Sequence, residues 1–297
     1  MDIIQNAGKK LYHLNRWKER KRYLFFRFRM WWHKEDVAKY LQFFEDNTLR
    51  QQILWNTPSF LEQISRRFFY KNSTWQERIN LIQHHIEILE NKLTTDTLNK
   101  IYVSNQPILI WQDEYDNKPL TLDLRFHSGQ RKEGCLCLLL QYDKEWLYQI
   151  IFWLDGDINN PIIYIGAIQG MLNGSDLIKN LTKAYFGYRT KNLIFYCLRA
   201  FARELNCKAI YGVTNDGYYA MNGLRFDRKL KTDFGEFWQE CEGIPAEDKR
   251  FYKMPINEHR KSMEELKPSK RAQHRRRFEK LDQIDAAIHL TMQNILK

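Results

Sequence analysis

The central part of the chain, residues 161–226, alternates between strand-like and helix-like hydrophobic patterns. Residues 162–168 are apolar at nearly every position, which is typical of a strand covered on both faces. Residues 192–205 repeat apolar side chains at the i, i+3/i+4, i+7 spacing of a helix that buries one stripe. A second apolar run follows at residues 209–213. This order of strand, helix and strand predicts a parallel crossover at the centre of the fold.

Upstream of this unit the hydrophobic period changes from helical to strand-like. Residues 35–99 contain three stretches with 3.6-residue spacing, so we expect three helices there, with Ser73 or Thr74 as an N-cap and Pro58 at a first helical position. From Tyr102 onward, short apolar segments separated by turn residues predict an antiparallel meander. The predicted strands are IYVSN, PILIWQDE, PLTLDLRFHS, GCLCLLLQYD and EWLYQIIFWLD.

The last third of the chain adds three further elements. DFGEFWQE predicts a short helix, residues 250–254 an additional edge strand, and residues 270–296 a long helix after a break at Pro268. Together these elements predict an α+β fold with a mixed β-sheet. We divide the chain into a basic aromatic segment (1–34), a helical region (35–100), an α+β core (101–258) and a basic C-terminal helix (259–297).

Composition narrows the class of protein. A hydrophobic share of 43% with 14% aromatic residues predicts a folded, globular chain. The five cysteines form no C-x-x-C pair, so neither a disulfide framework nor a metal site is indicated. Charges interrupt the N-terminus where a signal peptide needs an apolar core, and no apolar run approaches the roughly 18 residues of a membrane span. We therefore expect a cytoplasmic protein.

The net charge of +11 is concentrated at the two ends of the chain. Residues 1–34 hold ten Lys/Arg against two acids, and residues 260–280 hold nine against three. The remainder is slightly acidic, so the basic character belongs to two terminal segments. The basic stretch RAQHRRR opens the predicted C-terminal helix, where cations oppose the helix dipole. Either an anionic partner or a solvated face paired with Glu264, Glu265 and Glu279 accounts for it.

The segment RWKERKRYLFFRFRMWW, residues 16–32, is basic and aromatic at once. Three interpretations remain open. The rings pack on the body of the protein, or they lie at the surface of the inner membrane while the cations meet anionic lipid, or they stack on nucleic-acid bases. We expect nucleic acid least.

The central pattern resembles the Gcn5-related N-acyltransferase (GNAT) fold. The features that carry the resemblance are the meander, the buried strand with Gly166 and Gly170, the following helix and strand, and a Tyr-rich segment ending at Asn222-Gly223-Leu224-Arg225-Phe226. In that fold one strand bulges and diverges from its parallel neighbour, and an acyl-thioester cofactor enters between them. The resemblance implies that Gly166, Ala167 and Ile168 line the acyl-CoA or acyl-carrier-protein arm.

The loop before the helix departs from the GNAT pattern. The family places a glycine-rich turn there, whereas this chain has Gly187-Tyr188-Arg189-Thr190-Lys191-Asn192. Two cations therefore stand where backbone N–H groups would cradle a pyrophosphate. We expect an anionic ligand or phosphate at Arg189, Lys191 and Asn192, because cations at a helix start are unfavourable without an anion.

A broader resemblance, over residues 107–281, is to the bacterial VirK/YbjX family. The matching pieces are PLTLDLRFHSGQRKEGCLCLLL, YIGAIQG, LTKAYFGYRTKNLIFYCLRAFARELNC, AIYGVTN, DFGEFWQE, FYKMP and PSKRAQHRRRFEKLD. The resemblance implies an association with virulence, envelope integrity and tolerance of antimicrobial peptides. It names no reaction.

Three residues are candidate catalytic groups. Glu133 precedes Gly134 at the start of a strand, where it is either a turn residue or a general base that deprotonates an amine. Asn215 and Tyr219 follow the second parallel strand, at the carboxyl end where open sheets bind ligands. Tyr219 is a candidate proton donor to a leaving thiolate.

Two hypotheses of function follow. One is an acyltransferase that uses an acyl thioester on coenzyme A or a carrier protein. The alternative is a non-catalytic module with a degenerate transferase fold, which binds an anionic membrane surface, an acidic protein or nucleic acid through its basic ends.

Overall fold

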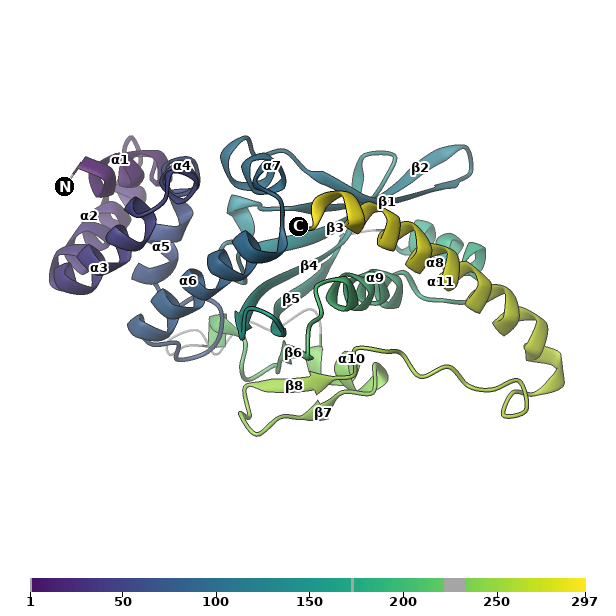
Figure 1. Ribbon diagram of the computed structural model, residues 1–297. Helices are drawn as coiled ribbons and strands as arrows, with labels where there is room; N and C mark the ends of the chain where they lie inside the picture. Colours follow the sequence, from purple (N-terminus) through teal and green to yellow (C-terminus); the bar gives the residue numbers. More distant parts are fainter. Residues whose placement is uncertain (1, 172–173, 222–232) are drawn as a thin grey trace.

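One mixed eight-stranded sheet forms the centre of the computed structural model, which describes residues 2–171, 174–221 and 233–297 (Figure 1). The strands lie in the order β1-β2-β3-β4-β5-β6-β8-β7. They are β1 (Ile108–Tyr115), β2 (Lys118–Arg125), β3 (Leu136–Tyr142), β4 (Glu145–Gly156), β5 (Pro161–Gly170), β6 (Ala209–Val213), β7 (Ile244–Pro245) and β8 (Phe251–Met254). The fold is therefore α+β, as the alternating patterns predict.

Helices occupy both ends of the chain, the crossover between β5 and β6, and the segment between β6 and β7 (Figure 1). The α-helices are α1 (Asp2–Leu11), α2 (Trp17–Trp32), α3 (Lys34–Glu45), α4 (Thr48–Asn56), α5 (Ser59–Ser65), α6 (Trp75–Lys92), α7 (Thr95–Leu98), α8 (Ser175–Ala184), α9 (Thr190–Glu204), α10 (Phe234–Glu240) and α11 (Pro268–Ile295). Short helical turns lie at η1 (Asn99–Val103), η2 (Ser128–Gln130) and η3 (Tyr219–Met221).

The meander and the parallel crossover are confirmed. Strands β1 to β5 pair in sequence order and antiparallel. Strand β6 then pairs parallel to β5, from Ile162 opposite Ala209 to Ile165 opposite Gly212. Helix α9 makes this crossover, and it buries nearly its whole length because it lies between the sheet and α11.

The helical region differs from the sequence prediction in its detail. The segment IYVSN is not a strand, because Asn99–Val103 forms a π-helical turn that continues α7. Two further helices, α4 and α7, join the three that were expected, and Pro58 lies one residue before α5. Thr74 is the N-cap of α6, with a complete capping box to Glu77.

The strand expected at an edge of the sheet lies inside it. Strand β8 pairs with β6 on one side and with the two-residue β7 on the other. The sequence prediction of an edge position was wrong because Ile244–Pro245 is too short to give a recognisable strand pattern.

The two faces of the sheet are covered by different elements. Phe152 and Trp153 are neighbours in β4 and therefore point to opposite faces. Phe152 packs against Phe201 of α9, whereas Trp153 packs against Phe69 and Tyr70 in the loop before α6. We call these the α9 face and the Trp153 face.

A buried histidine joins α6 to the sheet. The ring of His85 accepts the Leu154 N–H at 3.1 Å and lies 2.9 Å from the hydroxyl of Tyr102. Complete burial lowers the pKa of His85 to about 3, so the ring stays neutral. His84, its neighbour, pairs with Asp155 at the surface.

The two basic ends of the chain pack on the same hydrophobic core as the sheet. Helix α11 buries an apolar stripe against α9 and β1, and α2 buries Phe26 and Met30. The cations of α11 that find partners bond to the main chain or to other elements, as Arg277 does to the carbonyl of Phe186 and Lys280 to Asp113. Neither bonds to the glutamates considered from the sequence.

Candidate functional site

Strand β5 carries a β-bulge at Gly166. Ile165 lies opposite Phe152 and Ala167 lies opposite Ile151, so Gly166 is the extra residue on the bulged strand. A Cβ on Gly166 would lie 1.8 Å from the carbonyl oxygen of Glu133, so only glycine allows the Glu133 loop to approach the strand this closely.

The bulge lies where the two parallel strands separate. The pairing between β5 and β6 ends at Ile165 and Gly212, whereas β5 continues to Gly170. The carboxyl half of β5 therefore has β4 on one side and no strand on the other among the described residues. In open α/β sheets, ligands commonly bind at an edge of this kind.

Glu133 is buried on the Trp153 face, beside the bulge. It is 5% exposed, and the hydroxyl of Tyr218 donates a hydrogen bond to Oε1 at 3.0 Å. Tyr219 also hydrogen bonds to this carboxyl, and its ring packs edge-on against Phe68. Tyr218 pairs through its main chain with Tyr70, which fixes the two tyrosines over the glutamate.

Burial changes the acidity of Glu133. Desolvation raises the pKa of its carboxyl to about 7, although the hydrogen bond from Tyr218 and the charge of Lys132 act in the opposite direction. A carboxyl with this pKa exchanges protons near neutral pH, as a general base requires.

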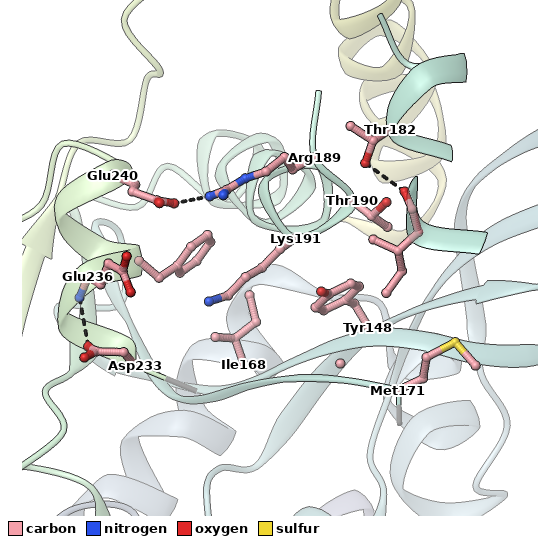
Figure 2. Close-up of a pocket in the computed structure, with 13 residues that line it drawn as sticks. Tyr148, Ile168, Met171, Thr182, Arg189, Thr190, Lys191, Asp233, Glu236 and Glu240 are labelled. Atoms are coloured by element: carbon pink, nitrogen blue, oxygen red, sulfur yellow. Dashed lines mark hydrogen bonds and ion pairs between the residues drawn. The ribbon is translucent and has the colours of Figure 1, made fainter. Parts of the chain in front are cut away.

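A pocket of about 500 Å³ lies on the α9 face, at the carboxyl end of β5 (Figure 2). Tyr148 and Ile168 form its floor, because Tyr148, Ile150 and Phe152 alternate onto the α9 face and Ile168 pairs with Ile150. Its walls come from α8, from the start of α9 and from α10. They include Arg189, Thr190 and Lys191 on one side and Asp233, Glu236 and Glu240 on the other.

The two cations of the pocket have different surroundings. Arg189, the N-cap of α9, forms an ion pair with Glu240 (Figure 2). Lys191 extends into the pocket, with its ammonium 3.8 Å from the centre of the Phe237 ring. Desolvation lowers the pKa of Lys191 to about 8. Within the described residues Lys191 has no carboxylate at ion-pair distance, so it is the cation that remains available to an anion.

The sequence-predicted site residues separate into two groups. Glu133, Gly166 and Tyr219 lie together on the Trp153 face, and Ile168, Arg189 and Lys191 meet at the pocket. Ala167, in the bulge, is fully buried.

Asn192 and Asn215 do not line the pocket, but each bonds to a residue that does. Asn192 accepts a bond from Arg189 in the first turn of α9. Asn215 donates to Asp233 and accepts the N–H of Phe234, so it holds the start of α10. The motif at 222–226 lies outside the described residues.

Sequence reasoning missed several residues of the site. Asp233, Glu236 and Glu240 recur at i, i+3 and i+7 in DFGEFWQE, which places them on one face of a helix and was a usable signal. Tyr148 carried no signal, because only strand pairing shows that it lies beneath the loop of Arg189.

Two kinds of feature are absent from the described residues. No group of three or more His, Cys, Asp or Glu side chains is arranged to hold a metal ion. In the same part of the chain, no helix combines the length and the apolar character needed to cross a membrane.

Comparison with known proteins gives relatives without a described activity. The chain is 26% identical to the uncharacterized protein YbjX of Escherichia coli K12, over 78% of this chain and 72% of that protein. It is 23% identical to an uncharacterized protein of Haemophilus influenzae, over 86% and 84% of the two chains. It is also 24% identical to a protein of Mannheimia haemolytica named membrane protein LapB, over 71% and 88%.

No solved structure matches the chain significantly. The family match is extensive, since it runs over residues 15–289 and so includes the helical region, the sheet and most of α11. The chain belongs to the family described as "Protein of unknown function (DUF535)".

Proposed function

We propose that the protein is an acyltransferase that takes an acyl group from a thioester on a phosphopantetheine arm and passes it to an amine or hydroxyl. The observation that carries the proposal is the bulge at Gly166, which sets the buried carboxyl of Glu133 where β5 leaves β6. A bulged strand, a diverging parallel partner and a helix that starts beside the opening also support a GNAT-like core.

The pocket residues fit a single phosphate better than an extended polyanion. The first N–H groups of α9 have no acceptor within the helix, and Lys191 extends beside them. The acids of α10 line the opposite wall and repel additional negative charge. This balance favours a phosphopantetheine arm presented by a carrier protein over the diphosphate of coenzyme A.

A thioester would supply the activated acyl group at this site. Glu133 would accept the proton of an amine, because only the neutral amine attacks a thioester, and its pKa of about 7 suits that role. Tyr219, hydrogen bonded to the same carboxyl, would return a proton to the leaving sulfur. Glu133 and the pocket lie on opposite faces, so donor and acceptor would approach from opposite sides of β5.

The biological setting in the proposal is the bacterial cell envelope. The relative from Mannheimia haemolytica is named a membrane protein, and its match covers 88% of that chain. This supports an acceptor at or near the envelope.

The test is a thermal shift of the full chain with four probes: coenzyme A, acetyl-coenzyme A, acyl carrier protein with its phosphopantetheine arm, and acyl carrier protein without it. A ligand present at 100 times its dissociation constant adds about 2.7 kcal/mol to the free energy of unfolding. We expect a shift with the armed carrier protein that the unarmed one does not give. Thiol release from the acylated donor then reports transfer, and Glu133→Gln removes it while leaving the thermal shift in place.

The absence of a shift with every probe would contradict the acyltransferase proposal. The Arg189–Glu240 ion pair favours the alternative in that case, because it supplies internally the negative charge that an external ligand would otherwise provide. The protein would then be a non-catalytic module on a transferase-like fold.

A further inference from the structure

Helix α2 presents a continuous apolar stripe to solvent. Half of the large hydrophobic side chains that are exposed in the described part of the chain lie on this one helix. Each is more than half exposed: Trp17, Leu24, Phe25, Phe28, Trp31 and Trp32. At about 100° and 1.5 Å per residue, their spacing places them on one side of α2 over a length of about 22 Å.

The exposure of this stripe is fixed by the opposite side of the same helix. Phe26 and Met30 are buried in the core, and His33, just after α2, stacks on Trp75 of α6 with ring centroids 4.0 Å apart. Tyr12, just after α1, also packs against Phe26. Helix α2 therefore cannot rotate to bury the stripe without breaking its contacts with α1, α5 and α6.

Cations flank the stripe on both sides. Helix α2 carries six Lys/Arg residues and one acid. By helix geometry Lys18, Arg22 and Arg29 lie along one flank, and Arg20 and Arg27 along the other. Lys21 lies within the stripe, with its ammonium over the Trp17 ring. An apolar centre rich in Trp and Phe, bordered by Lys and Arg, matches the layering of an anionic bilayer surface.

The same contacts argue against two other occupants. Phe28, Trp31 and Trp32 touch one another, with ring centroids 5.9 to 6.4 Å apart, so no gap is left between these rings into which a nucleic-acid base could insert. A second copy of the chain would bring two rows of arginine together, at a repulsive cost.

We propose that α2 docks lengthwise on an anionic phospholipid bilayer, with the apolar stripe among the upper acyl chains and the flanking cations at the headgroups. Figure 1 draws α2 in the group of N-terminal helices at one end of the molecule, with the sheet beside them. The inference stands independently of the acyltransferase proposal.

The experiment is co-sedimentation of the full chain with vesicles of phosphatidylcholine, with and without phosphatidylglycerol. Leu24→Ser and Leu290→Ser are a matched pair, because these leucines are 61% and 63% exposed and lie on α2 and α11. We expect wild type and Leu290→Ser to bind the anionic vesicles equally. Leu24→Ser weakens binding about threefold, and Trp31→Ser with Trp32→Ser weakens it about tenfold or more. Omitting phosphatidylglycerol or raising the salt concentration weakens binding of the wild type.

Equal thermal unfolding of all four proteins shows that the substitutions act at the surface. Three results overturn the proposal. They are the absence of wild-type binding to anionic vesicles, binding that the stripe variants leave unchanged, and a stripe-dependent dimer or oligonucleotide complex in place of vesicle binding.

Discussion

The two faces of β5 differ in the number and the burial of their charged groups. On the Trp153 face a single carboxyl, Glu133, is buried beneath two tyrosines, and its pKa is raised to about 7. On the α9 face two cations and three acids stand around an open pocket, where Arg189 and Glu240 neutralise each other. Glu133 is isolated and desolvated, whereas the pocket groups are numerous and include a partly solvated ion pair, Arg189–Glu240.

The difference indicates where each face derives its chemistry. A desolvated carboxyl gains reactivity from its surroundings, so the backbone that buries it matters most. An exposed ion pair such as Arg189–Glu240 contributes little to folding, and the remaining charges of the pocket are free to bind a ligand. Substitutions on the Trp153 face should therefore change stability and pH dependence, and those on the α9 face should change ligand binding.

Gly166→Ala tests whether the β-bulge requires glycine for the close approach of the Glu133 loop to β5. Of the substitutions considered, it should lower the free energy of unfolding the most. The new Cβ would lie 1.8 Å from the main-chain oxygen of Glu133, which cannot move without displacing its loop. We expect a loss of about 3 kcal/mol or more in the free energy of unfolding, measured by urea denaturation. Gly235→Ala is the control, because its Cβ meets no atom closer than 3.4 Å. Equal stability of the two variants would contradict the close approach.

Glu133→Gln tests the isolated carboxyl. Below pH 4.5 both the folded and the unfolded protein hold its proton, but between pH 4.5 and about 7 only the folded protein does, so stability falls as pH rises through this window. At pH 9 the variant should be more stable than wild type by about 3 kcal/mol at most, and at pH 4 the two should agree. Glu114→Gln, on an exposed position of β1, serves as the control. A variant that unfolds like wild type at every pH would show that Glu133 is solvated.

Asn215→Ala tests whether the residue is structural or catalytic. Its side chain bonds to Asp233 and to the N–H of Phe234, so its removal should destabilise the start of α10 by about 1 to 2 kcal/mol. Asn80→Ala is the control, because Asn80 is exposed and bonds to Gln76 in its own helix. If activity is lost while thermal stability is unchanged, Asn215 has a direct role in the reaction and the structural interpretation fails.

The double variant Arg189→Ala with Lys191→Ala should have the smallest effect on stability, less than about 0.5 kcal/mol, because the Arg189–Glu240 pair is solvated. Its effect on the thermal shift given by the armed carrier protein should be large, because Lys191 faces the pocket. Glu240→Gln distinguishes the contribution of Arg189 from that of Lys191. It removes the ion-pair partner of Arg189, so anion binding should become stronger. Loss of cooperative unfolding in the double variant would instead assign these cations to the core.

The sequence predicted more of the fold than of the candidate site. Strand periodicity identified β1 to β5, and the buried run before α9 identified the parallel crossover, because both signals are local. The prediction of a strand at Tyr102 was wrong, because a local pattern does not register tertiary contacts. Tyr102 lies in a π-helical turn, and its hydroxyl contacts His85 of α6. The position of β8 depended on β7, a partner too short to predict.

By itself the sequence determined the order of the elements, the central strand-helix-strand unit and the residues able to carry chemistry. Only the tertiary structure decided which of those residues meet. Glu133 and Tyr218 are 85 positions apart, and the hydrogen bond between them exists only because the bulge at Gly166 and the bridge from Tyr70 bring both loops to one point. The tertiary structure also decided which side of the basic aromatic helix α2 is buried. Periodicity shows that α2 has two sides, but which side is buried depends on the partners that the rest of the chain supplies.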